Sequence, residues 1–137
     1  MAIRFHPTVG TVLICDFSGL KEPEMVKRRP VVVISPRLRD REGLCAVVPL
    51  STTQPNAIKP YHHRVHFEQT MPEPYTASYM WAKCDMVYTF SWRRLTVPHS
   101  GKDDSGKRIT DLRVLDADTL KAIQQCVKVG LGLTVDT

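Results

Sequence analysis

The stretch that decides the fold is Lys27-Arg28-Arg29-Pro30-Val31-Val32-Val33-Ile34-Ser35, in which a basic cluster runs directly into a β-branched segment. Four consecutive β-branched residues are typical of a buried strand. Pro30 disfavours helical backbone at Arg29, so that residue is expected to be extended. An arginine at the entrance of a buried strand presents a permanently charged, planar group suited to phosphate. Taken alone, the segment is explained more simply as a basic cluster that aids solubility.

Short apolar or alternating segments on both sides of this stretch predict a mainly β protein. The segments that we expect to be strands are 10–17, 29–35, 44–50, 62–67, 78–85, 86–90 and 108–113. Pro49 is expected to make the end of the third strand an edge or a bulge, because proline has no amide hydrogen to donate. Residues 18–28, 36–43 and 98–106 are polar or charged, and we expect them to be loops.

The apolar period changes near the C-terminus from that of a strand to that of a helix. A stripe at helical spacing consists of Leu120, Ile123, Val127 and Leu131. Asp116 or Asp118 can cap the start of this helix, and Gly130 and Gly132 weaken its end. Several short strands followed by one helix predict a small β-barrel with an appended helix. We expect residues 1–137 to form a single domain.

Charge and hydropathy restrict the partners and the compartment. The chain of 137 residues carries a net charge of +5, a modest excess that favours polyanions such as RNA. Residues 1–8 contain no apolar core of a secretory signal, and no apolar run reaches the roughly 18 residues that a membrane span needs. We therefore expect a cytoplasmic protein without a membrane partner.

The four cysteines are widely spaced and form no C-x-x-C pair. In the cytosol we expect Cys15, Cys45, Cys84 and Cys126 to be reduced and partly buried. A zinc site that combines them with His62 or His63 is a weaker alternative, because no pair has the spacing of zinc ligands. We expect no metal and no cofactor.

Several segments together resemble the MazF/PemK (Kid) family of toxin endoribonucleases, and within it the YifN-type PemK-like proteins. The matching segments are Gly10-x-Val12 with Asp16-Phe17, Glu24 ahead of Arg29-Pro30-Val-Val-Val-Ile-Ser35, Val47-Val-Pro-Leu-Ser51, Trp81-Ala-Lys-Cys-Asp85 followed by Arg94-Leu95, and the C-terminal helix. The resemblance implies an SH3-like barrel with a C-terminal helix, usually as a homodimer. It also implies metal-independent cleavage of single-stranded RNA by a type II toxin that an antitoxin protein inhibits.

The resemblance also assigns candidate catalytic residues. The catalytic arginine of the family falls on Arg29, and its threonine falls on Ser51, which keeps the hydroxyl group. An Arg-x-Asp pair found in some members is Lys83-x-Asp85 here, and lysine keeps the charge without the bidentate fork. The histidine that some members carry in the first loop is absent, and Pro23 lies near its place.

From the chemistry of RNA cleavage we expect Arg29 to stabilise the phosphorane and Ser51 to orient the scissile phosphate. Asp85 is the candidate base, and Lys83 would keep it ionised. The candidate RNA-binding residues are Lys27, Arg28, His62, Arg37, Arg93 and Arg94. Tyr61, Tyr79 and Trp81 could stack bases.

Non-catalytic explanations stay open at this point. Arg29 could pair with Glu24, Ser51 could cap a turn, and Lys83 with Asp85 could be a surface ion pair. The alternative function is a catalytically degenerate SH3-like module that binds RNA or a peptide. A DNA-binding regulator is less favoured, because no helix-turn-helix pattern is found.

Overall fold

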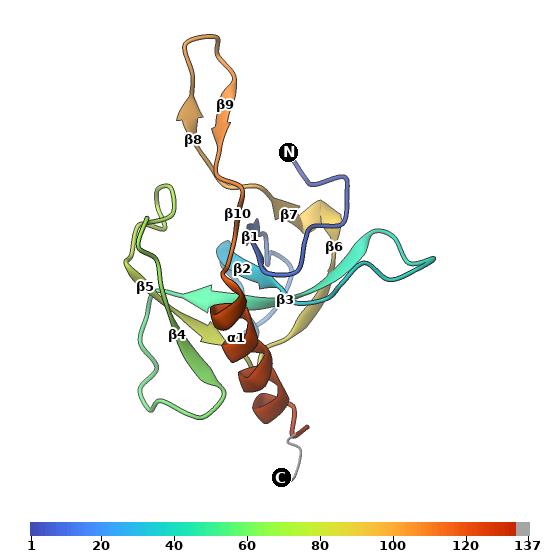
Figure 1. Cartoon of the computed structure of the whole chain (residues 1–137), viewed down its shortest axis with the longest axis vertical. Coiled ribbons are helices and arrows are strands. Elements are labelled where there is room, and N and C mark those ends of the chain that lie inside the picture. Colours follow the sequence, from blue (N-terminus) through green and yellow to red (C-terminus); the bar gives the residue numbers. More distant parts are fainter. Residues whose placement is uncertain (134–137) are drawn as a thin grey trace.

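A curled antiparallel sheet forms the body of the protein, and one C-terminal helix lies across it (Figure 1). The computed structural model describes residues 1–133. The elements are β1 (Thr11–Cys15), β2 (Arg29–Val33), β3 (Leu44–Ser51), β4 (His62–His66), β5 (Tyr79–Lys83), β6 (Tyr88–Ser91), a 3-10 turn (Trp92–Arg94), β7 (Leu95–Thr96), β8 (His99–Lys102), β9 (Arg108–Thr110), β10 (Arg113–Val114) and α1 (Ala117–Gly130). The main sheet has the order β10-β1-β2-β3-β5-β4, with β6 on β3 and β7 on β1. This architecture confirms the predicted mainly β fold with a C-terminal helix.

Strand β3 organises the sheet, because three other strands pair with it. It pairs with β2 along one side, and on the other side first with β6 and then with β5. Pro49 lies between Val47, the last residue paired with β6, and Leu50, the first paired with β5. The missing amide hydrogen of Pro49 therefore falls where the ladder changes partner. The predicted weakening near Pro49 does not end the strand, which continues to Ser51.

Alternating side chains of the central strands enter two separate cores. Val32, Val48 and Leu50 belong to the core that α1 covers with its buried Ile123. Val31 and Val47 point to the other face, into a core that includes Phe17. This alternation follows from the period of two residues in a strand. One face of β2, β3 and β5 is therefore occupied by the helix-side core, and the other face of β2 and β3 covers the second core along most of its length.

Helix α1 starts at the predicted cap and ends one residue before the predicted stripe does. The Asp116 carboxylate accepts a hydrogen bond from the Thr119 amide at 3.0 Å, so Asp116 is the N-cap. Leu131 lies beyond the last helical residue, Gly130, and its side chain is 49% exposed. No helix formed by residues 1–133 has the length and the apolar character that crossing a bilayer requires.

Gly130 is the point at which α1 approaches the turn after β5. A Cβ atom there would lie 2.8 Å from the Asp85 Cα and 3.0 Å from the Asp85 amide nitrogen. Real Cβ atoms do not approach backbone this closely, so any larger residue must push the helix away from the sheet. The glycine that weakens the helix in isolation is therefore needed for docking the helix.

We expect Gly130→Ala to destabilise the protein by about 1–3 kcal/mol, as for overpacking of a tight contact. The opposing gain in helix propensity is only about 1 kcal/mol. Urea unfolding monitored by circular dichroism measures the difference. The matched control is Gln124→Ala, an exposed position of the same helix, which should change the free energy of unfolding by less than about 0.5 kcal/mol. Equal stability of both variants would contradict the tight contact.

The polar segment 98–106, predicted to be a loop, instead contributes to a β-hairpin. Strands β8 and β9 form a separate two-stranded sheet that projects from the body (Figure 1). The predicted strand 108–113 is interrupted, because Asp111 donates its amide to the Pro98 carbonyl at 2.7 Å and its carboxylate pairs with Arg113. The chain then resumes as β10 beside β1.

Candidate functional site

Arg29 and Ser51, two of the candidate catalytic residues, lie side by side at neighbouring strand ends. Arg29 Nη1 is 3.5 Å from Ser51 Oγ, a long and therefore weak hydrogen bond. Ser51 is 2% exposed, and its Oγ also accepts a hydrogen bond from the Thr53 amide at 3.1 Å. The Arg29 Nε is buried and has no hydrogen-bond partner within residues 1–133. The guanidinium therefore retains unused donors beside a fixed hydroxyl group.

No carboxylate neutralises Arg29. Over residues 1–133, no acidic oxygen lies within 4 Å of its guanidinium nitrogens. Glu24, the partner suggested by the structural alternative, accepts instead from the Lys21 amide at 2.8 Å. A partly buried cation with no counterion attracts an anion strongly, because the charge is incompletely solvated. This arrangement suits a phosphate of a ligand.

Arg29 begins a row of side chains that crosses four strands on one face, which we call the Arg29 row. The register of β2 with β3 places Arg29 opposite Ser51. Ser51 lies opposite Trp81 on β5, and Trp81 lies opposite Arg64 on β4. Directly opposed residues of antiparallel strands share a face. The Arg29 row thus places two arginines, a hydroxyl and an indole on the face opposite α1.

The next row on this face contains His62 and Lys83, which are opposed on β4 and β5. His62 Nδ1 accepts a hydrogen bond from the Lys59 amide at 3.0 Å. The neutral ring therefore carries its proton on Nε2 and can donate it to a ligand. Lys83, two residues from Trp81 on the same side of the strand, adds a third cation to Arg29 and Arg64 on this face.

Tyr79 lies on the same face, on the side of the Arg29 row that is opposite to His62 and Lys83. Its ring is 45% exposed, with the Arg64 guanidinium 4.4 Å from the ring centre and the His66 ring 4.8 Å away. Exposed aromatic rings flanked by cations are suited to stacking on bases. Arg64 and His66 are absent from the predicted RNA contacts. The alternating basic positions 62, 64 and 66 were the signal for them, because alternate residues of a strand share a face.

Asp85 is not part of these rows, because strand β5 ends two residues before it. Strand β5 ends at Lys83, and Asp85 follows in an exposed turn whose backbone packs against Gly130. The expectation that alternation along one strand aligns Lys83 with Asp85 is wrong, because the strand has already ended. Nor does the structure, over residues 1–133, show an ion pair within 4 Å between the two side chains.

The remaining predicted basic residues divide between the site and other surfaces. Lys27 and Arg28 are exposed just before Arg29, and Arg28 Nη2 donates to Thr96 Oγ1 at 3.3 Å. Arg94 Nη1 donates to the carbonyls of Asp16 and Ser18 at 2.9 and 2.8 Å. Arg94 thus holds the loop after β1, which leads to Arg29.

Arg37 and Arg93 are not brought to the Arg29 row. Arg37 is exposed in the β2–β3 connection, beyond the opposite end of β2 from Arg29. Arg93 is in the 3-10 turn and lines a depression with the N-terminal residues. The structure therefore divides the predicted RNA-binding set between two surfaces.

Cys15, the cysteine beside this site, is not suited to act as a nucleophile. Cys15 is opposite Arg29 on β1, but burial raises the pKa of its thiol to about 12. The thiol is therefore neutral at physiological pH and a poor nucleophile. The part of the chain that the structure describes brings together no three His, Cys, Asp or Glu side chains that could hold a metal ion.

Comparisons with known proteins agree with this geometry. The sequence profile described as "PemK-like, MazF-like toxin of type II toxin-antitoxin system" matches residues 8–131, and the chain belongs to that family. The chain is similar to the putative uncharacterized protein YifN of Escherichia coli K12, at 32% identity over 114 residues, covering 69% of this chain and 75% of YifN. An uncharacterized protein of Haemophilus influenzae is 31% identical over 140 residues, which cover 93% of this chain and 92% of that protein.

Solved structures confirm the predicted MazF/PemK fold. An endoribonuclease in complex with its cognate antitoxin, from a mycobacterial species, superposes with a TM-score of 0.63 at 19% identity, covering 96% of this chain and 100% of that one. MazF from Deinococcus radiodurans superposes with a TM-score of 0.61 at 21% identity, covering 94% of this chain and 99% of that one. At such identities the likeness concerns the fold.

Proposed function

We propose that this protein is a toxin endoribonuclease that cleaves single-stranded RNA without a metal ion. The observation that carries the proposal is the unneutralised Arg29 guanidinium beside the buried Ser51 hydroxyl. Membership of the MazF-like toxin family supports the same function. The Arg29 row and Tyr79 give the face the cations and aromatic rings that single-strand binding requires.

In the proposed reaction the 2′-oxygen of the RNA attacks the adjacent phosphorus. A base removes the 2′-hydroxyl proton, the O2′–P bond forms, the P–O5′ bond breaks, and an acid protonates O5′. Arg29 stabilises the negative charge of the phosphorane, and Ser51 positions a phosphate oxygen. His62 donates a hydrogen bond from Nε2 to a phosphate oxygen, a water molecule protonates O5′, and Lys83 attracts the neighbouring phosphate. Asp85, an exposed carboxylate two residues after Lys83, is the proposed base.

We further propose an antitoxin partner, a homodimeric state and a cytoplasmic location. Structures similar to this chain include toxins described in complex with an antitoxin, among them MazE-MazF of Deinococcus radiodurans. The rows of cations opposite α1 form the surface that an acidic antitoxin segment would cover. Such a segment would inhibit by occupying the place of the RNA phosphates.

The decisive experiment is incubation of the purified protein with a long single-stranded RNA in EDTA. We expect fragments with 2′,3′-cyclic phosphate and 5′-hydroxyl ends, because the attacking oxygen belongs to the RNA itself. Fragment ends are read by their resistance or susceptibility to phosphatase and kinase treatment. RNA binding without any cleavage would replace this proposal with the SH3-like binding module.

A further inference from the structure

A second basic cavity lies between the N-terminal segment, the β2–β3 connection and the turn after β6. It has a volume of about 240 Å³. Its walls include Arg4, Phe5, His6, Arg37, Arg41 and Trp92. Two hydrogen bonds to backbone carbonyls fix its walls. The His6 side chain contacts the Ser35 carbonyl through Nε2 at 3.0 Å, and the Trp92 amide donates to the Gly43 carbonyl at 2.9 Å. The segments that carry the arginines are therefore held in place.

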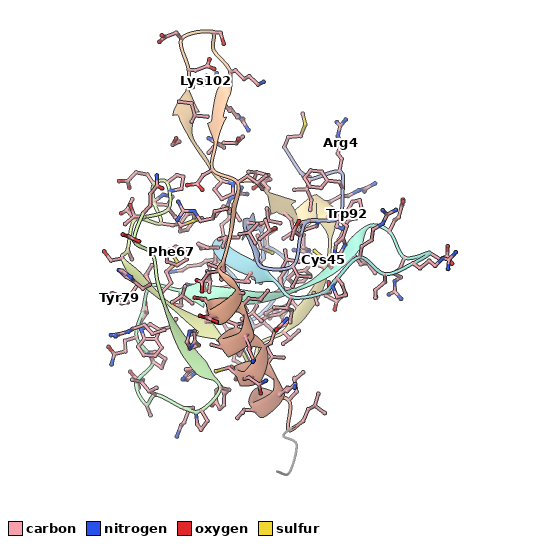
Figure 2. All side chains as sticks on the ribbon, in the orientation of Figure 1. Arg4, Cys45, Phe67, Tyr79, Trp92 and Lys102 are labelled. Carbon is pink, nitrogen blue, oxygen red and sulfur yellow. The ribbon has the colours of Figure 1, made fainter. Side chains whose placement is uncertain are left out.

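This cavity is remote from the Arg29 row. Arg29 starts β2, whereas Ser35, which contacts His6, lies beyond its far end. Six residues of extended chain separate them by about 20 Å at roughly 3.3 Å per residue. Figure 2 shows Arg4 and Trp92 together on one side of the molecule and Tyr79 on the other. The cavity is thus a separate site.

The cavity carries an excess of positive charge. Arg4, Arg37 and Arg41 face a single lining carboxylate, that of Glu42. For the portion of the chain described, these arginines have no ion-pair partner within 4 Å. Arg93 adds a fourth cation on the adjoining side of Trp92. Guanidinium groups that are not paired with a carboxylate can form bidentate hydrogen bonds to a phosphate.

Two aromatic side chains of the wall carry buried polar atoms. His6 donates its Nε2 hydrogen to the Ser35 carbonyl, so the neutral ring keeps an acceptor on Nδ1. Among the residues that the structure describes, that nitrogen and the Trp92 Nε1 donor are both buried and have no partner. Leaving such groups unpaired costs about 1–3 kcal/mol each. The exposed ring of Phe5 and the Trp92 wall offer a surface on which a base can stack, which distinguishes a nucleotide from an acidic peptide.

We propose that this cavity is a second nucleotide-binding site, which holds one nucleotide of a single-stranded nucleic acid outside the Arg29 row. The phosphates bind Arg37 and Arg41, and the base lies against Trp92 and Phe5. The volume suits one base or phosphate, with the rest of the strand outside. The site does not depend on cleavage at Arg29, so it would bind even if the proposed nuclease activity failed.

The test is fluorescence anisotropy of a short, labelled, 2′-O-methylated RNA, which cannot be cleaved through its 2′-oxygen. Arg41→Ala is compared with Arg39→Ala, because each removes one charge from the same connection and Arg39 does not line the cavity. We expect Arg41→Ala to weaken binding about tenfold and to lower the slope of log K against log salt by about 0.7. Arg39→Ala should stay within about twofold. Trp92→Leu should also weaken binding about tenfold, through lost stacking.

Equal effects of Arg41→Ala and Arg39→Ala would overturn the site, since general charge would then explain binding. Displacement of the RNA by a poly-glutamate peptide at the same charge concentration would also overturn it in favour of an acidic protein partner, if that displacement requires Arg41 and is unchanged in Arg29→Ala. Competition by a nucleoside monophosphate, lost in Arg41→Ala, would support a nucleotide site. Melting curves show whether each variant is folded. An Arg41-dependent affinity in a protein that cuts no RNA would sustain this site and refute the nuclease proposal alone.

Discussion

Replacing Arg29 with alanine is expected to lower the rate of RNA cleavage by about 100- to 1000-fold, the usual cost of removing one donor to a developing anion. The cause is specific to this position, because no carboxylate of the described part of the chain lies within 4 Å of the guanidinium and its contact with Ser51 is long. The folded state should lose little, since the substitution removes only one weak hydrogen bond. Initial rates on a defined RNA in EDTA measure the effect, and thermal melting measures stability.

Two further variants separate charge from geometry at this position. Arg29→Lys keeps the charge and loses the planar fork, so we expect it to recover only part of the rate. Arg108→Ala removes an exposed arginine from the projecting β8–β9 hairpin, and its rate should match that of the wild type. Full activity in Arg29→Ala would remove Arg29 from the mechanism, and an equal loss in Arg108→Ala would indicate a general effect of charge.

The sequence and the family resemblance predicted Arg29 at the start of one apolar strand and Ser51 at the end of another, but not their contact. Extended backbone before Pro30 and the continuous run Val31–Val33 define the start of β2. The end of β3 was also visible, since polar residues follow Ser51. Neither inference required knowledge of the register between distant strands. The register explains why both residues reach the same face.

Contacts that depend on distant elements could not be predicted in this way. The break at Asp111 depends on a hydrogen bond to Pro98 and on the pairing of Asp111 with Arg113. The separation of Arg37 from Arg29 depends on the direction of β2 and on the N-terminal segment that His6 anchors. Charge alone groups such residues together, whereas sheet topology distributes them over different surfaces.

Phe17→Ala is expected to destabilise the protein by about 3–5 kcal/mol, the cost of emptying a large buried site. Phe17 is fully buried and packs edge-to-face on Tyr88 and Phe90, with ring centres 5.3 and 5.5 Å away. A domain of this size has a total stability of about 5–15 kcal/mol, so a large fraction of it would be lost. Urea unfolding with a fluorescence readout measures the change.

The same substitution should also loosen the entrance to the proposed active site. Phe17 begins the loop that leads to Arg29, and the loop is held by the Met25 amide, which donates to the Tyr88 hydroxyl at 3.0 Å. Phe17→Leu keeps most of the apolar volume and should lose clearly less stability. If Phe17→Ala still folds at low temperature but cleaves RNA slowly, the aromatic cluster positions Arg29. Unchanged stability in Phe17→Ala would show that the second core does not support this loop.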